Sequence, residues 1–318
     1  MIRVAIIGAG SIGCHLAFSC RKNGWNVTVF DTSEIALKRL KSELYPKRYG
    51  SWDPEIKINN MSGCNCKNQN IGDAYLFFNS IPSTHSYAME LLSHSFPQHG
   101  TVISADFQEA GKGQQEKTWF SDKGKNILLS IILFPDNIAP SKLFLMNMAV
   151  SLAVRKSILI EYPVPENIYL KWPNDVYIFN KKVAGILIKN SLNFHKVQST
   201  IISVGLNVNQ ASFPDFLPSA TSLFLNTFKE TNRKEIEKNL FAALEEYLTY
   251  INEQPDLLKF QYHSCLLGMN KEHTFLIKKN NETLQGTITG VSDKGELIVK
   301  SSSDYQSLYF QHGDLIYL

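Results

Sequence analysis

Four short polar segments between residues 83 and 209 carry the side chains that could do chemistry. Hydroxyl, amide and imidazole groups can hydrogen-bond a polar ring or a base, and lysines can neutralise carboxylate or phosphate groups. Together these residue types predict a site that binds an anionic, partly polar ligand. The segments are Ser83-Thr84-His85, residues 108–119, Lys171 to Asp175 with Lys182 soon after, and Val204 to Asn209.

The second segment, residues 108–119, is a glycine loop. Gly111 and Gly113 free its backbone, and Lys112 and Lys117 bring positive charge. Such a loop can fold over a phosphate or an adenylate. An ordinary solvated loop has the same composition, so the segment alone leaves both interpretations open.

Lys182 precedes the apolar run Val183 to Leu187 and follows Asn174 and Asp175 by way of a predicted hairpin. Burying a lysine charge is costly unless an anion meets it, and a ligand carboxylate or α-phosphate would be such an anion. The alternative is a strand-end lysine that extends its charge into solvent.

Gly205, in the fourth segment, allows a close backbone approach. Asn207 and Asn209 could read a base or an amide, or could only shape a turn.

The elements that must position these residues alternate between strands and helices. Strands are predicted near 75–78, 101–105, 127–134, 168–172, 176–179, 183–189 and 199–208. Thr84 is a candidate cap for the helix that follows it. A helix from Pro140 through Val154 is apolar on nearly every face and should be buried, whereas residues 233–252 form an amphipathic helix. Residues 273–318 read as short strands of a small β-barrel.

Residues 1–58 form a separate pattern of strand, helix, strand, helix. Gly8, Gly10 and Gly13 follow a strand over residues 4–7, and Asp31 ends a second strand over residues 26–30, as in a dinucleotide-binding fingerprint. The pattern resembles the start of an NAD-binding Rossmann domain but stops after about 45 residues, so we expect a vestigial or packing βαβ fragment rather than NAD binding. Residues 59–72 read as a linker, and Met61 could be the natural start of the functional chain.

Composition limits the function classes. The chain has 318 residues, is 44% hydrophobic and carries 32 basic against 29 acidic side chains. This supports about two folded domains and gives no indication of a nucleic-acid or membrane partner. The five cysteines form no disulfide framework, which favours the cytoplasm.

The four segments, in this order, resemble the catalytic core of the biotin protein ligases from about Ala74 to Leu318. The run Lys-Trp-Pro-Asn-Asp at 171–175, followed by Lys182-Val-Ala-Gly-Ile-Leu, is the most specific part. The resemblance implies an α+β fold in which a mixed or antiparallel-sheet ligase domain (73–265) precedes an SH3-like barrel (266–318). It also implies that biotin and Mg-ATP form biotinyl-5′-AMP, and that biotin then passes to a lysine of a biotin carboxyl carrier domain of acetyl-CoA carboxylase or a related carboxylase.

The resemblance also assigns site residues. It implies Lys182, Asp175 and Lys112 as catalytic, with Asp175 beside Mg²⁺. The ATP-binding residues would be Lys117, Trp119, Asn174 and Asn207. The biotin-binding residues would be Ser83, Thr84, His85, Gln108, Gly111, Lys112, Gly113, Gln114, Lys182, Gly185 and Gly205.

This chain departs from the family pattern in the glycine loop and just after Thr84. Gln114, Gln115 and Glu116 stand where Arg, Arg and Gly are frequent, Lys112 replaces a frequent Arg, and His85 replaces a frequent Asn. We expect the adenylate to leak more readily than in arginine-rich relatives, because lysine cannot make a bidentate fork.

Other functions are compatible with parts of the sequence. A lipoate or other acyl ligase would share the fold, a nicotinamide oxidoreductase is supported only by residues 8–31, and a non-catalytic biotin or adenylate binding module would share the pocket. Some relatives carry an amino-terminal winged helix and repress transcription. Residues 1–58 lack that pattern, so we expect no operator binding. Homodimerisation through the central sheet remains a family-level expectation.

Overall fold

The computed structural model describes residues 3–7, 26–31, 57–60, 70–95, 97–114, 117–135, 138–193 and 196–318. The chain divides into two compact units, one made of residues 1–69 with 91–97 and the other of residues 70–90 with 98–318.

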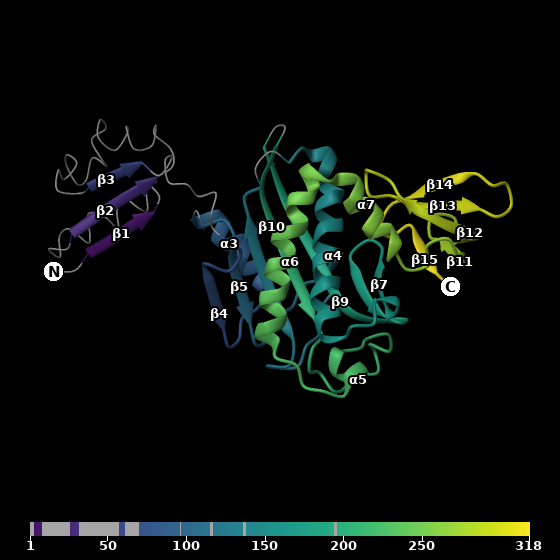
Figure 1. The fold of residues 1–318 in the computed structure, drawn as a ribbon, viewed down its shortest axis with the longest axis horizontal. Helices are drawn as coiled ribbons and strands as arrows, with labels where there is room; N and C mark the ends of the chain where they lie inside the picture. Colours follow the sequence, from purple (N-terminus) through teal and green to yellow (C-terminus); the bar gives the residue numbers. More distant parts are fainter. Residues whose placement is uncertain are drawn as a thin grey trace. The chain divides into compact units, whose positions relative to one another are not determined.

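The first unit contains a three-stranded parallel sheet (Figure 1). Its strands, in order, are β1 (Arg3–Ile7), β2 (Asn26–Asp31) and β3 (Lys57–Asn60). The first two lie where the sequence predicts strands. The third was not predicted, because its four residues, Lys-Ile-Asn-Asn, show no apolar alternation and are strand only through pairing with β2. Gly8, Gly10 and Gly13 lie outside the described residues.

A seven-stranded mixed sheet forms the centre of the second unit. The β4–β5 pair is parallel and every other neighbouring pair is antiparallel, which confirms the predicted α+β class. In spatial order the strands are β4 (Tyr75–Phe78), β5 (Thr101–Ala105), β6 (Ile127–Leu133), β10 (Lys196–Leu206), β9 (Lys181–Asn193), β8 (Asp175–Ile178) and β7 (Ile168–Lys171).

Helices cover one face of this sheet, with α4 and α6 running side by side across it (Figure 1). They are α4 (Leu143–Glu161), which follows the 3₁₀ turn η3 (Pro140–Lys142), α6 (Arg233–Glu253) and α7 (Pro255–Ser264). The predicted burial of α4 is confirmed. Its composition would also suit a membrane span, but 61% of its most apolar window is buried inside the protein. Each fully buried leucine contributes about 1.5–3 kcal/mol to this packing.

Three further helical segments are shorter: α3 (Thr84–His94), η4 (Pro165–Asn167) and α5 (Leu223–Thr227). The sequence suggested Thr84 as the cap of α3, but Thr84 does not cap this helix. It is the first helical residue, and the Ser83 hydroxyl oxygen instead accepts a hydrogen bond from the Ser86 amide at 3.3 Å. The Thr84 side chain is therefore available for other contacts.

The carboxy-terminal strands form a five-stranded antiparallel sheet in the order β14-β13-β12-β11-β15. Phe275, Ile288 and Val299 are fully buried in its core. The Trp172 indole nitrogen donates to the Gly295 carbonyl at 2.9 Å, which ties this module to the start of the Lys171–Asp175 region. The strands are β11 (Glu272–Ile277), β12 (Glu282–Val291), β13 (Leu297–Ser301), β14 (Ser307–Phe310) and β15 (Leu315–Tyr317).

Candidate active site

A cavity joins the start of α3, the glycine loop and the middle of β9 and β10. On β10, Ile202, Val204 and Leu206 belong to the hydrophobic core, so the alternating Ser203 and Gly205 face the opposite side of the sheet. Lys182, Lys112 and Ser83 share this one cavity, as the sequence interpretation required. The lining residues are Ser83, Thr84, His85, Gln108, Lys112, Gly113, Gln114, Trp119, Leu129, Asn174, Lys182, Gly185, Ile186, Leu187, Ser203, Val204 and Gly205.

The floor of the cavity is a pair of glycines beneath the indole of Trp119. Gly185 and Gly205 are register partners on β9 and β10. A Cβ on Gly185 would lie 2.8 Å from Trp119 Cζ3, and a Cβ on Gly205 would overlap the same indole still more. Both positions therefore require glycine because the indole lies directly on the backbone. Trp119 Nε1 is buried and has no hydrogen-bond partner among the described residues.

The glycine loop folds back on itself as a hairpin. The Gly113 amide donates to the Lys117 carbonyl at 2.7 Å, and the Trp119 amide donates to the Gly111 carbonyl at 3.0 Å. A Cβ on Gly111 would meet the Trp119 carbonyl oxygen at 2.6 Å, so this glycine is needed for close approach as well as for backbone freedom. The hairpin places Lys112 and Trp119 in the cavity. Gln115 and Glu116 lie outside the described residues.

Lys182 forms an ion pair with Asp175. Its Nζ lies 2.7 Å from Asp175 Oδ1, and the two side chains are 32% and 22% exposed. The same ammonium lies 5.5 Å from the centre of a Trp119 ring, within cation–π range. The sequence predicted that a lysine at this position needs an anion. Asp175 supplies that anion here. Because both side chains are partly exposed, a ligand can still reach the pair.

Lys171 lies close to this pair and was not assigned a role from the sequence. Its Nζ lies 5.0 Å from the Tyr177 ring centre and 4.9 Å from that of Tyr317, which comes from β15. Burial lowers the pKa of Lys171, the positive charge of Lys182 lowers it further, and Asp175 opposes the shift. Its position as the first residue of the Lys-Trp-Pro-Asn-Asp run was the available signal.

A chain of hydrogen bonds, which we call the hydroxyl chain, lines the other end of the cavity. Gln108 Oε1 accepts from the Thr84 amide at 2.8 Å and from the Thr84 hydroxyl at 3.0 Å. Ser130 Oγ lies 2.9 Å from Thr84 Oγ1 and 2.8 Å from Ser203 Oγ, and His85 Nδ1 lies 2.8 Å from Ser203 Oγ. Sequence reasoning missed both serines. Their signal was a hydroxyl between apolar residues, Ser130 between Leu129 and Ile131 and Ser203 between Ile202 and Val204.

Four of the predicted site residues, Gly111, Lys117, Asp175 and Asn207, are not among the lining residues of the cavity. Asp175 contacts it through Lys182. The Asn207 amide donates to the Thr221 carbonyl at 2.9 Å, while its Oδ1 is buried without a partner among the described residues. Asn207 therefore holds the backbone at Thr221 in this structure. Asn174 does line the cavity, and its side chain is bound to the Ile186 carbonyl on β9.

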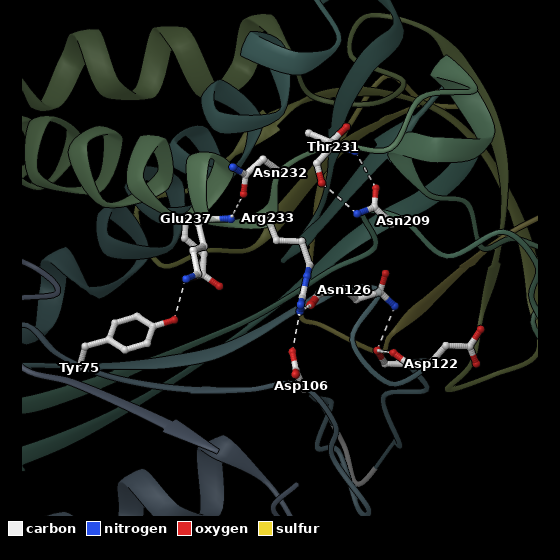
Figure 2. Close-up of polar contacts among 11 residues, drawn as sticks. Tyr75, Asp106, Asp122, Asn126, Asn209, Thr231, Asn232, Arg233 and Glu237 are labelled. Carbon is white, nitrogen blue, oxygen red and sulfur yellow. Dashed lines mark hydrogen bonds and ion pairs between the residues drawn. The ribbon is translucent and has the colours of Figure 1, made fainter. Parts of the chain in front are cut away.

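A polar cluster outside the cavity anchors the segment that leads into the glycine loop (Figure 2). Arg233, at the start of α6, donates to Asp106 Oδ1 at 2.9 Å and to the Asn126 carbonyl at 3.1 Å. Asp106 stands two residues before Gln108, so this ion pair holds the base of the loop against the helix layer. Tyr75 and Glu237 form a second bridge, in which the phenol donates to Glu237 Oε2 at 2.7 Å.

Comparisons with known proteins give one consistent similarity. The model of the biotin/lipoate A/B protein ligase family matches residues 77–209. The bifunctional ligase/repressor BirA of Bacillus spizizenii is 31% identical over 247 residues, which cover 76% of this chain and 74% of that protein. The biotin–[acetyl-CoA-carboxylase] ligase of Mycobacterium tuberculosis is 28% identical over 223 residues, covering 69% of this chain and 79% of the relative.

The fold comparison agrees with the sequence comparison. The solved structure of the biotin protein ligase from Aquifex aeolicus in complex with biotin and ATP has a TM-score of 0.64 and 25% identity to this chain. It covers 77% of this chain and 99% of that one. The similarity therefore extends over about three quarters of the chain in both sequence and structure.

Proposed function

The chain belongs to the biotin protein ligase family, and we propose that the cavity between α3, β9 and β10 carries out both steps of that family's reaction. The enzyme activates biotin with ATP to biotinyl-5′-AMP and transfers biotin to a lysine of a carrier protein. The observation that carries the proposed site is that Lys182 and Lys112 share one cavity with Thr84, His85, Gln108 and Ser203 of the hydroxyl chain.

The end of the cavity beside α3 suits the ureido ring of biotin, which has one carbonyl acceptor and two N–H donors. Gln108 Oε1 is committed to the amide and hydroxyl of Thr84, so the Gln108 NH₂ group can donate to the ureido carbonyl. Ser83 and His85 line the same end and offer further polar atoms. Leu187, the register partner of Ser203 on the cavity side of the sheet, supplies apolar surface for the rest of the ring system.

The opposite end suits the reacting groups. In the first step a biotin carboxylate oxygen forms a bond to the α-phosphorus, and the bond from that phosphorus to the pyrophosphate oxygen breaks. Two anions must approach each other, so the positive charges of Lys182 and Lys112 offset the repulsion and stabilise the charge that develops. Trp119 and the paired glycines Gly185 and Gly205 give this end a flat surface on which a planar group can lie.

Magnesium fits the site only together with the nucleotide. The described residues contain no cluster of three or more His, Cys, Asp or Glu side chains that could hold a metal by themselves. Mg²⁺ is usually bound by one or two carboxylates plus substrate phosphates and water, and Asp175 is a suitable carboxylate beside Lys182. When bound with ATP, the ion would neutralise phosphate charge.

In the second step the carrier lysine attacks the biotinyl carbonyl carbon, the bond to AMP breaks, and the amine loses a proton. The amine must be neutral when it attacks, so a nearby carboxylate that orients it or accepts the proton is useful. The ion pair of Asp175 with Lys182, beside which the reacting carbonyl would be held, supports this role for Asp175.

The carrier is a biotin carboxyl carrier domain of acetyl-CoA carboxylase or a related carboxylase. Residues 266–318 act as an SH3-like barrel, supported by their five-stranded antiparallel sheet. Residues 1–58 are a Rossmann-like fragment without NAD binding, supported by their short parallel sheet. A cytoplasmic location, the absence of operator binding and homodimerisation remain predictions.

The direct test is transfer of radiolabelled biotin to a purified carrier domain, with the full chain and with a chain that starts at Met61. We expect ATP-dependent labelling of one carrier lysine by both chains, and no labelling of a carrier whose acceptor lysine is replaced by arginine. Lipoate, offered in place of biotin, tests the acyl-ligase alternative. Preferential transfer of lipoate would overturn the assignment of biotin as substrate.

A further inference from the structure

The direction of every hydrogen bond in the hydroxyl chain is fixed by its two ends. Because the Thr84 amide donates to Gln108 Oε1, that atom is the amide oxygen, and the Thr84 hydroxyl must also donate to it. The single Thr84 hydroxyl proton is then used, so Ser130 donates to Thr84. By the same reasoning Ser203 donates to Ser130.

This direction determines the tautomer of His85. Ser203 has used its one proton on Ser130, so at the 2.8 Å contact it can only accept, and His85 Nδ1 must carry the donated proton. In a neutral imidazole the other nitrogen, Nε2, is then an acceptor. His85 is 8% exposed and lines the cavity, and no hydrogen bond from a described residue to Nε2 is observed.

We propose that the Nε2 lone pair of His85 accepts a hydrogen bond from a ureido N–H of biotin, so that protonation of His85 weakens biotin binding. This inference rests on the proposed function, since it names the contact that the biotin site makes with one ligand donor. Gln108 would read the carbonyl of the ring and His85 one of its N–H groups.

The surroundings of His85 keep it neutral. Burial lowers the pKa of His85 below its ordinary value of 6.5, and the positive charges of Lys189 on β9 and Lys112 in the glycine loop lower it further. The elements on the hydroxyl-chain side, β6 and β10, contribute the uncharged Ser130 and Ser203. Because biotin would bind the neutral form, affinity should be constant near pH 7.5 and fall as the pH drops through the pKa of the free enzyme.

Calorimetric titration of the full chain with biotin from pH 8.0 down to the lowest pH at which the protein stays folded tests the proposal. We expect the Kd of the wild-type protein to rise as His85 becomes protonated, by about two- to tenfold once protonation is complete, as for the loss of one hydrogen bond. The variant His85→Asn presents an amide oxygen at every pH, so its Kd should be independent of pH over this range. A wild-type profile as flat as that of His85→Asn, or a fall in affinity that persists in the variant, would overturn the proposal.

Two further readouts keep this test separate from a failure of the proposed function. Nitrogen-15 spectra of labelled histidine should show His85 as the Nδ1–H tautomer in the wild-type protein, and loss of that preference in Ser203→Ala. An Nε2–H tautomer in the wild-type protein would contradict the direction of the chain, whether or not His85→Asn folds. If the wild-type protein shows no affinity for biotin at any pH, the proposed function itself is wrong, and the proposal that depends on it is overturned too.

Discussion

Gly185 and Gly205 face each other across β9 and β10, and the absence of a side chain on both allows the indole of Trp119 to lie on the sheet backbone. This contact joins the glycine loop to the sheet at the point where Lys182 also approaches the indole. The position of the loop, and with it the position of Lys112, therefore depends on two residues that contribute no functional group.

One methyl group added at Gly205 should strongly affect stability and ATP binding. Gly205→Ala places a Cβ inside the indole position, so Trp119 must move, at a cost of about 1–3 kcal/mol for an overpacked site. We expect a lower melting temperature, a shifted tryptophan emission and a raised KM for ATP. The same substitution in a Trp119→Ala background should cost much less. Equal destabilisation in both backgrounds would show that the contact is not responsible.

The side chain at position 112 should determine how firmly the enzyme holds biotinyl-5′-AMP. Arginine at this position could form two parallel hydrogen bonds to a phosphate or carboxylate, whereas lysine acts as a point charge. We expect Lys112→Arg to slow the dissociation of biotinyl-5′-AMP several-fold, measured by chasing labelled adenylate from the enzyme. Lys123→Arg, at another lysine that does not line the cavity, is the matched control. Unchanged or faster release from Lys112→Arg would argue against an adenylate contact.

Glu237 predicts a specific pH dependence of stability. Burial raises the pKa of Glu237 above its ordinary 4.5, although the Tyr75 hydrogen bond and Arg233 oppose the shift. The folded state therefore holds this proton to higher pH than the unfolded state, and the contribution of Glu237 to stability falls as the pH rises above 4.5. Glu237→Gln keeps an acceptor for Tyr75 without the charge.

Urea unfolding of the wild-type protein and Glu237→Gln between pH 4.5 and 7.5 measures this effect. As the pH rises, the free energy of unfolding of Glu237→Gln should increase relative to that of the wild type. Glu235→Gln removes an exposed carboxylate from the same turn of α6 and serves as the control. A difference between wild type and Glu237→Gln that stays constant with pH would contradict the prediction.

Lys171 should have the opposite effect, so that its contribution to stability increases with pH in the alkaline range. Its lowered pKa means that the unfolded chain binds this proton more readily than the folded protein, so its contribution to stability rises as the pH increases from 7.5 toward its ordinary pKa of 10.5. Lys171→Met keeps the aliphatic packing between Tyr177 and Tyr317 and removes the charge. Between pH 7.5 and 9.5 the wild type should gain stability relative to this variant. An identical pH dependence would show that the partial burial of Lys171 carries no such linkage.

The sequence predicted the central sheet well because its strands are marked by apolar runs between turn residues. The buried helix α4 was recognised for the same reason, although it extends beyond the predicted end at Val154 to Glu161. The predicted cap of α3 was wrong by one residue, because Ser83 and not Thr84 caps the helix. Both have suitable capping side chains, and only the contact of Thr84 with Gln108 distinguishes them.

The candidate site was predicted where a motif marked it and missed where tertiary contacts created it. Lys182, Lys112 and Ser83 converge as expected, because they stand at strand ends and in the loop over them. Ser130 and Ser203 contribute through pairing across β6 and β10, which no local pattern reveals. Asn207 looked like a base-reading residue, but its amide is used to hold the Thr221 backbone.

We propose that Lys182 neutralises the groups that react in the first step. Biotin-dependent exchange of labelled pyrophosphate into ATP measures that step without the carrier protein, and Lys181→Ala, an exposed lysine one residue away, is the matched control. We predict that Lys182→Ala slows exchange by about 10²–10³-fold, as for the loss of one preorganised charge, while Lys181→Ala retains the wild-type rate. Exchange at the wild-type rate by a folded Lys182→Ala variant would show that Lys182 does not neutralise the reacting groups.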